Sequence, residues 1–408
     1  MKAEPPKHLP YVGLRPFEQF ETRIFHGRYR ETREIVDQIF VNRVVVIYGQ
    51  SGTGKTSLLY AGIIPQLKEE GFEVLPPARL KSPIPSGINI KEIRNFYAFN
   101  CLRQYVGDQV DLRELANMTL AEYLKERQHA VDLLGQPLLR ALILDQVEEV
   151  LSDPPQYWQH RDPFFRQVHD TLQQDHLLRV VFVIREDAVG TLESYTALVP
   201  DKPQSRFRLE LMRKEAALSA LTGPLKQIGV SIEQAAAESI VNELLKTQIE
   251  TAPGIFEFST GEFIEPAQLQ IVAQKLFQTL PSDKTVITKQ DIEYFPNVEQ
   301  VISSFCDHVL REIVYQTGID ENRVRDWFEH ALITSSGIRK MVLMGREETG
   351  GLPNQILDQL VNKYIIRVVV QGGARWYELA HDRFIQPILY SNEKFRIAST
   401  ASEGIQNR

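Results

Sequence analysis

Cysteine is scarce in this chain, and its scarcity excludes two common ways of stabilising a protein. The only two cysteines, Cys101 and Cys306, lie far apart and show no CxxC spacing, so neither a disulfide framework nor a cysteine-ligated zinc site is expected. No run approaches the roughly 18 apolar residues of a membrane span. The polar start MKAEPPKHLP does not resemble a signal peptide. We therefore expect a cytoplasmic protein with no membrane partner.

Positive charge is also in short supply. The chain has 46 lysines and arginines against 53 acids, which gives a formal net charge of −7. This balance disfavours constitutive binding of nucleic acid, although a local basic patch is compatible with it. Internal repeats and low-complexity tracts are absent from the sequence. At 408 residues the chain exceeds the usual size of one hydrophobic core, so about two or three domains are expected.

The first half of the chain alternates short apolar runs with amphipathic stretches. Helical spacing occurs in stretches such as 57–70 and 164–175. Between them lie apolar runs rich in β-branched residues: RVVVIYG (43–49), FEVLPPARL (72–80), LLRALILD (138–145) and LRVVFVIRE (178–186). The alternation predicts an α/β fold in which helices cover both faces of a parallel sheet. The strand signals stop after FRLELM (207–212), so we predict one α/β domain for 1–212.

The second half has mostly helical spacing. We predict a small helical domain for 213–287. In 288–395 further helices lead to a helix at 353–363, then YIIRVVVQ, a Gly-Gly turn, RWYELA and a last helix. This order of elements is typical of a winged-helix module, which we predict for 288–395. Residues 396–408 are predicted to be a tail or the start of a linker.

The most specific motif is GQSGTGKT, which satisfies G-x-x-x-x-G-K-[ST] between a predicted strand and a predicted helix. Its glycines let backbone N–H groups turn towards a β-phosphate, and the helix N-terminus adds partial positive charge. Lys55 is expected to neutralise phosphate oxygens, and the hydroxyl of Thr56 to ligate Mg²⁺. The structural alternative is an ordinary glycine-rich turn. The predicted nucleotide-binding residues of this P-loop are Gly49, Gln50, Ser51, Gly52, Thr53, Gly54, Lys55, Thr56 and Ser57.

Acidic residues follow the third apolar run, in LILDQVEEV. Asp145 ends that strand, so its carboxylate is expected at the carboxyl edge of the sheet as the second Mg²⁺ ligand. Glu148 or Glu149 could polarise an attacking water, and the alternative is that both belong to a solvated helix start. Arg185 ends the next strand. It could sense a γ-phosphate or form an ion pair with the acids around it.

In chain order these motifs and their flanks resemble the novel STAND NTPases of bacteria, which are relatives of the NACHT and apoptotic ATPases. The resemblance covers about residues 10–392, and the run DQVEE is closer to this family than to the DE of AAA+ proteins. Arg185 then corresponds to the family's first sensor, and Glu148 to the second acid of the NACHT-type motif. The segments that carry the resemblance are GLRPFEQFETRIFHGRYRE, the P-loop, LILDQVEE, VVFVIREDAVG, GPLKQIG, FIEPAQLQIVAQKLF and YELAHDRFIQPILYSN.

The resemblance implies further nucleotide contacts. The FHGR segment, with Phe25, Gly27 and Arg28, is similar to the entry motif that borders the adenine and ribose. Pro224 corresponds to the helical-domain proline that packs on the adenine, and its alternative is a plain proline at position N1 of a helix. His381 corresponds to the winged-helix histidine that reaches the β-phosphate of ADP. A lone histidine is otherwise an ordinary core or surface residue.

The function implied is an ATP/ADP-operated switch in signalling or antiphage-type defence, with Mg²⁺-dependent and slow or vestigial ATP hydrolysis. ADP would hold the C-terminal domains closed, and ATP would open them for self-association. The family usually adds a sensor or effector domain, which a partner chain or a longer protein would supply here. Two other functions stay open. A DNA-binding ATPase or transcription regulator would use the winged helix, whose predicted region carries charges of both signs. A small-molecule kinase would leave two C-terminal helical modules unexplained.

Overall fold

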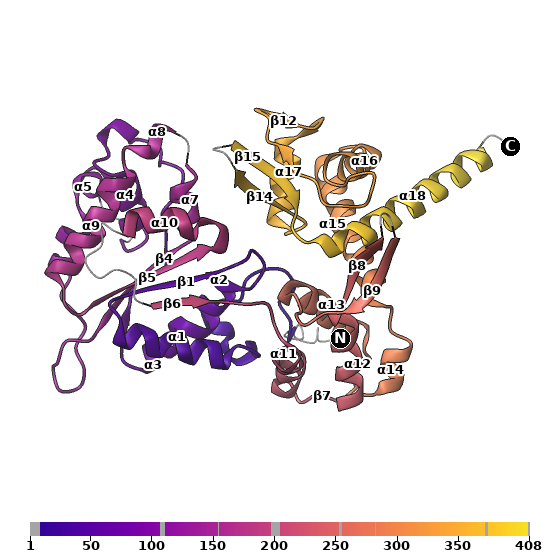
Figure 1. The fold of residues 1–408 in the computed structure, drawn as a ribbon, viewed down its shortest axis with the longest axis horizontal. Coiled ribbons are helices and arrows are strands. Elements are labelled where there is room, and N and C mark those ends of the chain that lie inside the picture. Colours follow the sequence, from indigo (N-terminus) through magenta and orange to yellow (C-terminus); the bar gives the residue numbers. More distant parts are fainter. Residues whose placement is uncertain are drawn as a thin grey trace, which may run out of the picture. The chain divides into compact units, whose positions relative to one another are not determined.

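The computed structural model describes residues 9–106, 111–153, 155–196, 205–252, 255–281, 283–371 and 374–406. The chain divides into two compact units, drawn in sequence colours in Figure 1. The P-loop unit comprises Phe17–Thr22 and Arg28–Glu210. The C-terminal unit comprises Met1–Pro16, Arg23–Gly27 and Leu211–Arg408. Within the described residues no helix is both long and apolar enough to cross a bilayer.

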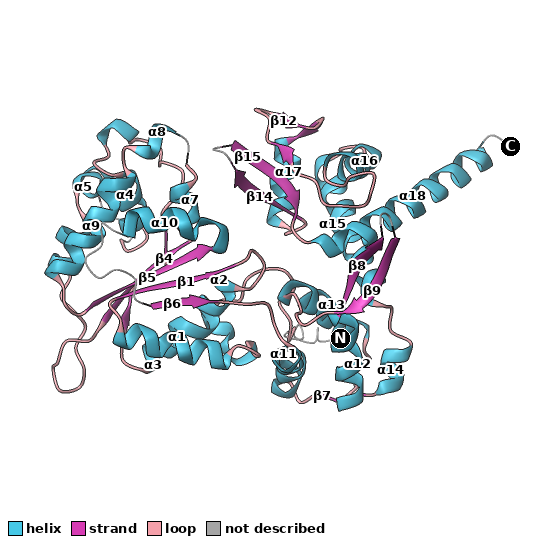
Figure 2. Ribbon diagram, in the orientation of Figure 1, coloured by secondary structure: helices cyan, strands magenta, loops and turns pink. Residues whose placement is uncertain are grey.

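A six-stranded parallel sheet forms the centre of the P-loop unit (Figure 2). The strand order is β2-β4-β5-β1-β6, and β3 also pairs with β4. Helices cover both faces, so β1 and β4 are buried along almost their whole length, which explains their continuous apolar sequences. The predicted α/β fold with a parallel sheet is confirmed. The strands are β1 (Val44–Gly49), β2 (Glu73–Val74), β3 (Ala78–Arg79), β4 (Arg140–Asp145), β5 (Leu178–Arg185) and β6 (Ser205–Arg208).

Helices α1 and α3 lie on one side of this sheet, and α4, α7 and α9 lie on the other (Figures 1 and 2). Phe165 of α9 packs over Phe182 of β5, with 6.2 Å between the ring centroids. The helices are α1 (Tyr29–Val41), α2 (Lys55–Ser57), α3 (Ile64–Glu69), α4 (Phe96–Leu102), α5 (Leu112–Asn117), α6 (Leu120–Glu126), α7 (Glu148–Leu151), α8 (Pro155–Trp158), α9 (Arg161–Gln174) and α10 (Val189–Thr196). The short 3-10 and π elements are η1 (Gln19–Ile24), η2 (Leu58–Ile63), η3 (Ile90–Glu92) and η4 (Glu186–Ala188).

Two predicted elements of this unit differ in detail from the structure. The run at 72–80 forms two short strands, β2 and β3, because Pro76 and Pro77 between them cannot donate to a sheet ladder. The helix after the P-loop is continuous from Lys55 to Glu69, but its middle part, η2, has π-helical hydrogen bonding. Such π segments are often found near functional sites.

The C-terminal unit is mainly helical and has one large hydrophobic core. Residues of both predicted C-terminal domains contribute to that core, for example Leu221 and Val272 with Ile302 and Phe384. The predicted boundary between 287 and 288 stays a prediction. The helices are α11 (Lys214–Gln227), α12 (Gln234–Leu245), α13 (Pro266–Thr279), α14 (Lys289–Glu293), α15 (Val298–Thr317), α16 (Glu321–Ala331), α17 (Asn354–Asn362), η5 (Asp382–Phe384) and α18 (Ile385–Gln406).

The strands β14 and β15 correspond to the runs YIIRVVVQ and RWYELA of the predicted winged helix, but strands also occur at 213–287, where only helices were predicted. Two of them, β8 and β9, form an antiparallel hairpin directly after α12. Further along, β11, β15 and β14 form a three-stranded sheet in that order, with α17 just before β14. The predicted Gly-Gly turn at 372–373 lies outside the described residues, and the winged-helix assignment stays a prediction. The strands are β7 (Ser231–Ile232), β8 (Lys246–Ala252), β9 (Ile255–Thr260), β10 (Val286–Ile287), β11 (Val342–Leu343), β12 (Glu348–Thr349), β13 (Leu352–Pro353), β14 (Ile366–Gln371) and β15 (Ala374–Leu379).

Candidate nucleotide site

The P-loop has the backbone shape that its glycines predict. Gly52 and Gly54 have φ angles of 87° and 89°, in the left-handed region where a side chain is disfavoured. The loop leaves the carboxyl end of β1 and enters the helical segment that begins at Lys55. The hydroxyl of Thr53 closes the loop by donating to the carbonyl of Gln50 at 2.9 Å. This is the strand–loop–helix context that the phosphate-binding motif requires.

The side chain of Arg28 forms hydrogen bonds with the P-loop and with the segment after β6. Its guanidinium is 4% exposed and donates to the carbonyls of Thr53 at 3.1 Å and Glu210 at 2.7 Å. It also forms an ion pair with Glu31 at 2.6 Å. Arg28 therefore ties the P-loop to the end of β6, a role that the sequence did not reveal. The hydroxyl of Ser57 is engaged as well, since it accepts from the backbone N–H of Phe17 at 3.3 Å.

Lys55 folds back over the loop. Its Nζ donates to the carbonyls of Gly49 at 2.8 Å and Gln50 at 2.9 Å. Burial lowers the pKa of Lys55 to about 8, and the nearby positive charge of Arg185 acts in the same direction. Glu148 opposes this change by attracting the ammonium. Burial makes the charged form of Lys55 less stable, and the negative charge of a bound phosphate would stabilise that form again. The lysine is therefore suited to binding an anion.

Asp145 lies at the carboxyl end of β4 and is 1% exposed. Its Oδ1 accepts from the backbone N–H of Gln146 at 3.0 Å, whereas its buried Oδ2 has no hydrogen-bond partner in the described structure. Burial raises the pKa of Asp145, and the charges of Arg79 and Lys55 partly counteract it. A buried carboxylate oxygen without a partner is costly unless a ligand or a cation satisfies it. The donor set of Asp145 and Thr56 therefore fits Mg²⁺.

The two glutamates after Asp145 have different surroundings. Glu148 accepts from the backbone N–H of Arg185 at 3.2 Å, and burial raises its pKa to about 7 despite the nearby Lys55. Burial also raises the pKa of Glu149, but the cations that oppose this are Lys81 and Arg79. Glu148 thus belongs to the P-loop side of the acidic turn. Glu149 belongs to the side of β3 and the loop after it.

Arg185 ends β5, and its backbone is in register with Gly49 on the neighbouring strand β1. Its guanidinium forms an ion pair with Asp187. Both alternatives considered for Arg185 are thus compatible with the structure. The arginine lies beside the P-loop, and it is also paired with a nearby acid.

Sequence reasoning missed two basic residues and a strained turn next to the acids. Arg79 in β3 is in register with Asp145, and Lys81 forms a 2.5 Å ion pair with the buried Asp153. Gln146 has a φ angle of 56°, which is unusual for a residue with a side chain. With its amide oriented to satisfy both neighbours, Gln146 donates to Glu149 and accepts from Arg79, each at 3.2 Å. Pro76 and Pro77 interrupt the apolar run at 72–80, and they could have indicated that Arg79 belongs to a separate strand.

Comparison with known families agrees with these features. The chain matches the family Novel STAND NTPase 1 over residues 10–387. The chain belongs to this family. A search of curated protein sequences gives no match.

Several solved structures match most of the chain with low sequence identity and low structural similarity. A Walker-type ATPase of Pyrococcus abyssi is 13% identical, with 92% of this chain and 98% of that chain covered and a TM-score of 0.43. The ORC2 protein of Aeropyrum pernix, in ADPNP–ADP complexes, is 14% identical, with coverages of 96% and 98% and a TM-score of 0.46. The ORC1 protein of the same organism, in complex with DNA, is 11% identical, with coverages of 93% and 96% and a TM-score of 0.41. At these scores the likeness assigns neither a ligand nor an activity to this STAND NTPase.

The predicted adenine-side residues lie in the C-terminal unit, apart from Arg28. Gly27 approaches α11 so closely that a Cβ there would lie 2.3 Å from the carbonyl oxygen of Ala216. The ring of His26 packs on Gly223 of the same helix. Pro224 lies inside α11, so the alternative of a plain N1 proline is wrong. The structure thus brings the segment that follows Phe25 against the helix that carries Pro224, and their contact with adenine stays a prediction.

His381 is buried within the C-terminal unit, 9% exposed. Its Nδ1 lies 2.5 Å from Oε2 of Glu265, and its ring meets the ring of Phe384 edge-on. Burial by itself raises the pKa of Glu265, but His381 and the Gln268 side chain lower it overall. The prediction that His381 reaches the phosphate of ADP joins residues of the two units and stays a prediction.

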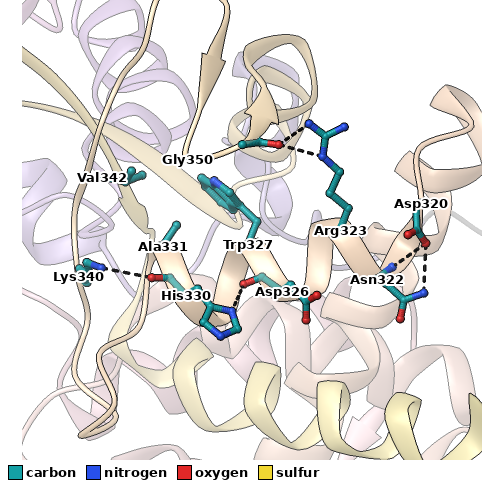
Figure 3. A pocket seen from close by; sticks show the side chains of 11 residues that line it. Asp320, Asn322, Arg323, Asp326, Trp327, His330, Ala331, Lys340, Val342 and Gly350 are labelled. Carbon is teal, nitrogen blue, oxygen red and sulfur yellow. Dashed lines mark hydrogen bonds between the residues drawn. The ribbon is translucent and has the colours of Figure 1, made fainter. Parts of the chain in front are cut away.

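A separate pocket of about 700 Å³ opens on the C-terminal unit (Figure 3). Trp327 of α16 forms its wall, and Arg323 and Lys340 lie on either side. These groups are engaged: Arg323 donates to the Gly351 carbonyl, Trp327 to that of Thr349, and Lys340 to that of His330. None of the predicted nucleotide-site residues lines this pocket.

Proposed function

We propose that this STAND NTPase binds ATP and ADP together with Mg²⁺, hydrolyses ATP slowly, and changes its self-association with the nucleotide bound. The role would be that of a switch in signalling or antiphage-type defence, working with a sensor or effector domain or a partner chain. The observation that carries the proposal is the buried, unpartnered Oδ2 of Asp145. It lies at the edge of the sheet where Lys55 and Glu148 also meet.

Each residue has a task in this proposal. Lys55 binds β- and γ-phosphate oxygens, and the backbone N–H groups between Gly49 and Lys55 surround the phosphates. Asp145 and Thr56 hold Mg²⁺, which when bound neutralises the developing phosphate charge. Glu148 orients the attacking water and takes its proton, because a carboxylate with a pKa of about 7 is matched to base chemistry near neutral pH.

The family membership supports a switch over a DNA-binding ATPase, and so does charge. Helix α17 holds the recognition position if the module is a winged helix, and its sequence NQILDQLVN has one acid and neither lysine nor arginine. Binding in the major groove depends largely on lysine and arginine contacts to phosphates, and α17 itself supplies none. No described feature of this chain favours DNA binding specifically enough to keep it as a second proposal.

Calorimetric titration of the full chain with ADP and with a non-hydrolysable ATP analogue, with and without Mg²⁺, tests the proposal. We expect both nucleotides to bind, and Mg²⁺ to strengthen binding of the analogue. Light scattering of the same samples should show a larger particle with the analogue than with ADP. The matched control is Lys68→Ala, because the ammonium of this lysine donates only to Gln19 among the described contacts. A chain that bound neither nucleotide would overturn the proposal.

A further inference from the structure

The guanidinium of Arg185 is held by an acid two residues along the chain. Its Nε donates to Oδ1 of Asp187 at 3.0 Å, and its Nη2 donates to Oδ2 at 2.8 Å. Two parallel bonds of this kind are the most specific way in which arginine recognises a carboxylate or a phosphate. The side chain of Arg185 is 20% exposed and that of Asp187 is 58% exposed, so the pair lies where solvent and ligands can reach it.

Arg185 is also close to the place where the phosphates are proposed to bind. It is in register with Gly49, the first residue of the P-loop motif. Its charge lowers the pKa of Lys55, and its backbone N–H donates to Glu148. The guanidinium therefore belongs to the phosphate edge of the sheet, while its Nε and Nη2 donate to Asp187 and its positive charge is balanced by that carboxylate.

We propose that Asp187 determines the preference of this chain between ATP and ADP by competing with the γ-phosphate for Arg185. The inference rests on the proposed function, since it requires nucleotide at the P-loop. ADP has no γ-phosphate and leaves the Arg185–Asp187 pair intact. The γ-phosphate of ATP gains the Nε–Nη2 edge of Arg185 only if that pair breaks. The cost of breaking it falls on ATP alone, so the pair lowers the affinity for ATP relative to ADP.

The neighbouring acid provides a matched control. Glu186 precedes Asp187 in η4, but its carboxylate pairs with Nε of Arg208 at 2.8 Å and not with Arg185. Glu186→Gln and Asp187→Asn remove the same charge from adjacent positions. Only the second removes the competitor for Arg185. A general effect of negative charge on nucleotide binding would therefore appear in both variants.

The test is calorimetry of the full chain with Mg²⁺ and either AMP-PNP or ADP. In Asp187→Asn we expect the affinity for AMP-PNP to rise about threefold to fivefold, the size expected for a partly exposed ion pair. The affinity for ADP should stay within about twofold of wild type, which is well below one tenfold step. Glu186→Gln should leave the ratio of the two affinities unchanged. In an Arg185→Gln background, Asp187→Asn should no longer change that ratio. Asp187→Ser should act like Asp187→Asn, so a folding defect in one variant does not decide the outcome.

Two results would overturn the inference alone: an unchanged ratio in both Asp187 variants, or an equal change in Glu186→Gln. An effect of Asp187→Asn that persisted without Arg185 would also overturn it, because there would then be no guanidinium for which Asp187 and the γ-phosphate could compete. If the wild-type chain bound neither nucleotide, the proposed function would fail and the inference with it. If the wild-type chain binds nucleotide, a failed test counts against the role of Asp187 and not against the proposed function.

Discussion

Replacing Glu148 by glutamine should stabilise the P-loop unit, and the gain should grow with pH. Burial raises the pKa of Glu148 from 4.5 to about 7, because the ionised carboxylate is poorly solvated in the folded chain. A carboxyl group whose folded pKa lies above its unfolded value binds more protons when folded. Its favourable contribution is therefore complete below about pH 4.5 and is lost as the pH rises to about 7. Glutamine does not titrate, so its contribution to the free energy of unfolding stays constant over this pH range.

The size of the effect follows from the same shift. One pKa unit corresponds to about 1.4 kcal/mol, so the rise from 4.5 to about 7 sets an upper limit of roughly 3 kcal/mol above pH 7. Partial solvent access at Glu148 reduces this, and we expect about 1–3 kcal/mol at pH 8 and close to zero near pH 4.5. The bond from the N–H of Arg185 should survive, since the amide oxygen of glutamine also accepts hydrogen bonds.

Urea denaturation between pH 4.5 and 8.5 measures this difference. Trp158 is the tryptophan of the P-loop unit, and Trp327 and Trp376 belong to the C-terminal unit. A background with both of the latter changed to phenylalanine lets fluorescence follow the P-loop unit alone. Glu122→Gln is a control of opposite sign, because hydrogen bonds from Thr119 lower the pKa of Glu122. A difference between Glu148→Gln and wild type that stays flat with pH would refute the reasoning.

Four further predictions concern the nucleotide. Lys55→Ala should abolish tight binding in calorimetry, because a charge-assisted phosphate contact of about 1.5–3 kcal/mol is lost; unchanged ATP affinity would contradict the P-loop assignment. Asp145→Asn should retain much of the binding but cut Mg²⁺-dependent phosphate release, and a wild-type rate would exclude the metal role. Glu149→Gln should hydrolyse ATP nearly like wild type, whereas Glu148→Gln should retain bound ATP; equal, small effects would leave neither as the base. His381→Ala should release ADP faster and self-associate without a trigger, as seen by light scattering, whereas Glu265→Gln, which keeps the imidazole, should do neither; identical behaviour of both variants would point to their shared ion pair instead.

The parts of the fold that could be predicted from the sequence are those with local signals. The run VVVIYG of β1 is buried on both faces, and such a run has few other stable environments in a water-soluble chain. The P-loop is equally local, because its glycines, its lysine and the helix start lie within eight residues. The hairpin of β8 and β9 was missed for the opposite reason. It follows α12 directly, without a glycine or proline at the boundary, and helical spacing before it masked the change.

The contacts that sequence reasoning missed act over long sequence separations. Arg28 bonds to Thr53 and to Glu210, which are 25 and 182 positions away. Arg79 reaches the acidic turn only because β3 pairs with β4 across 66 positions, from Arg79 to Asp145. Arg79 looks like an ordinary surface residue until the sheet forms, and the contacts of Arg28 with the P-loop also depend on the folded unit. Strand order is a property of the whole unit, and a single sequence carries no direct signal of it.

The surroundings of the two adjacent glutamates favour Glu148 over Glu149 as the proposed base. Successive residues on a helix point about 100° apart, so neighbours with the same chemistry face different surroundings. Glu148 faces Lys55 and the end of β5, whereas Glu149 faces Arg79, Lys81 and the amide of Gln146. A base must be both near the phosphates and able to take a proton at neutral pH. We propose Glu148 for this role, because the burial that raises its pKa occurs next to the lysine of the P-loop. Burial raises the pKa of Glu149 as well, but the cations that oppose this change, Lys81 and Arg79, lie on the other side of the turn, in and after β3.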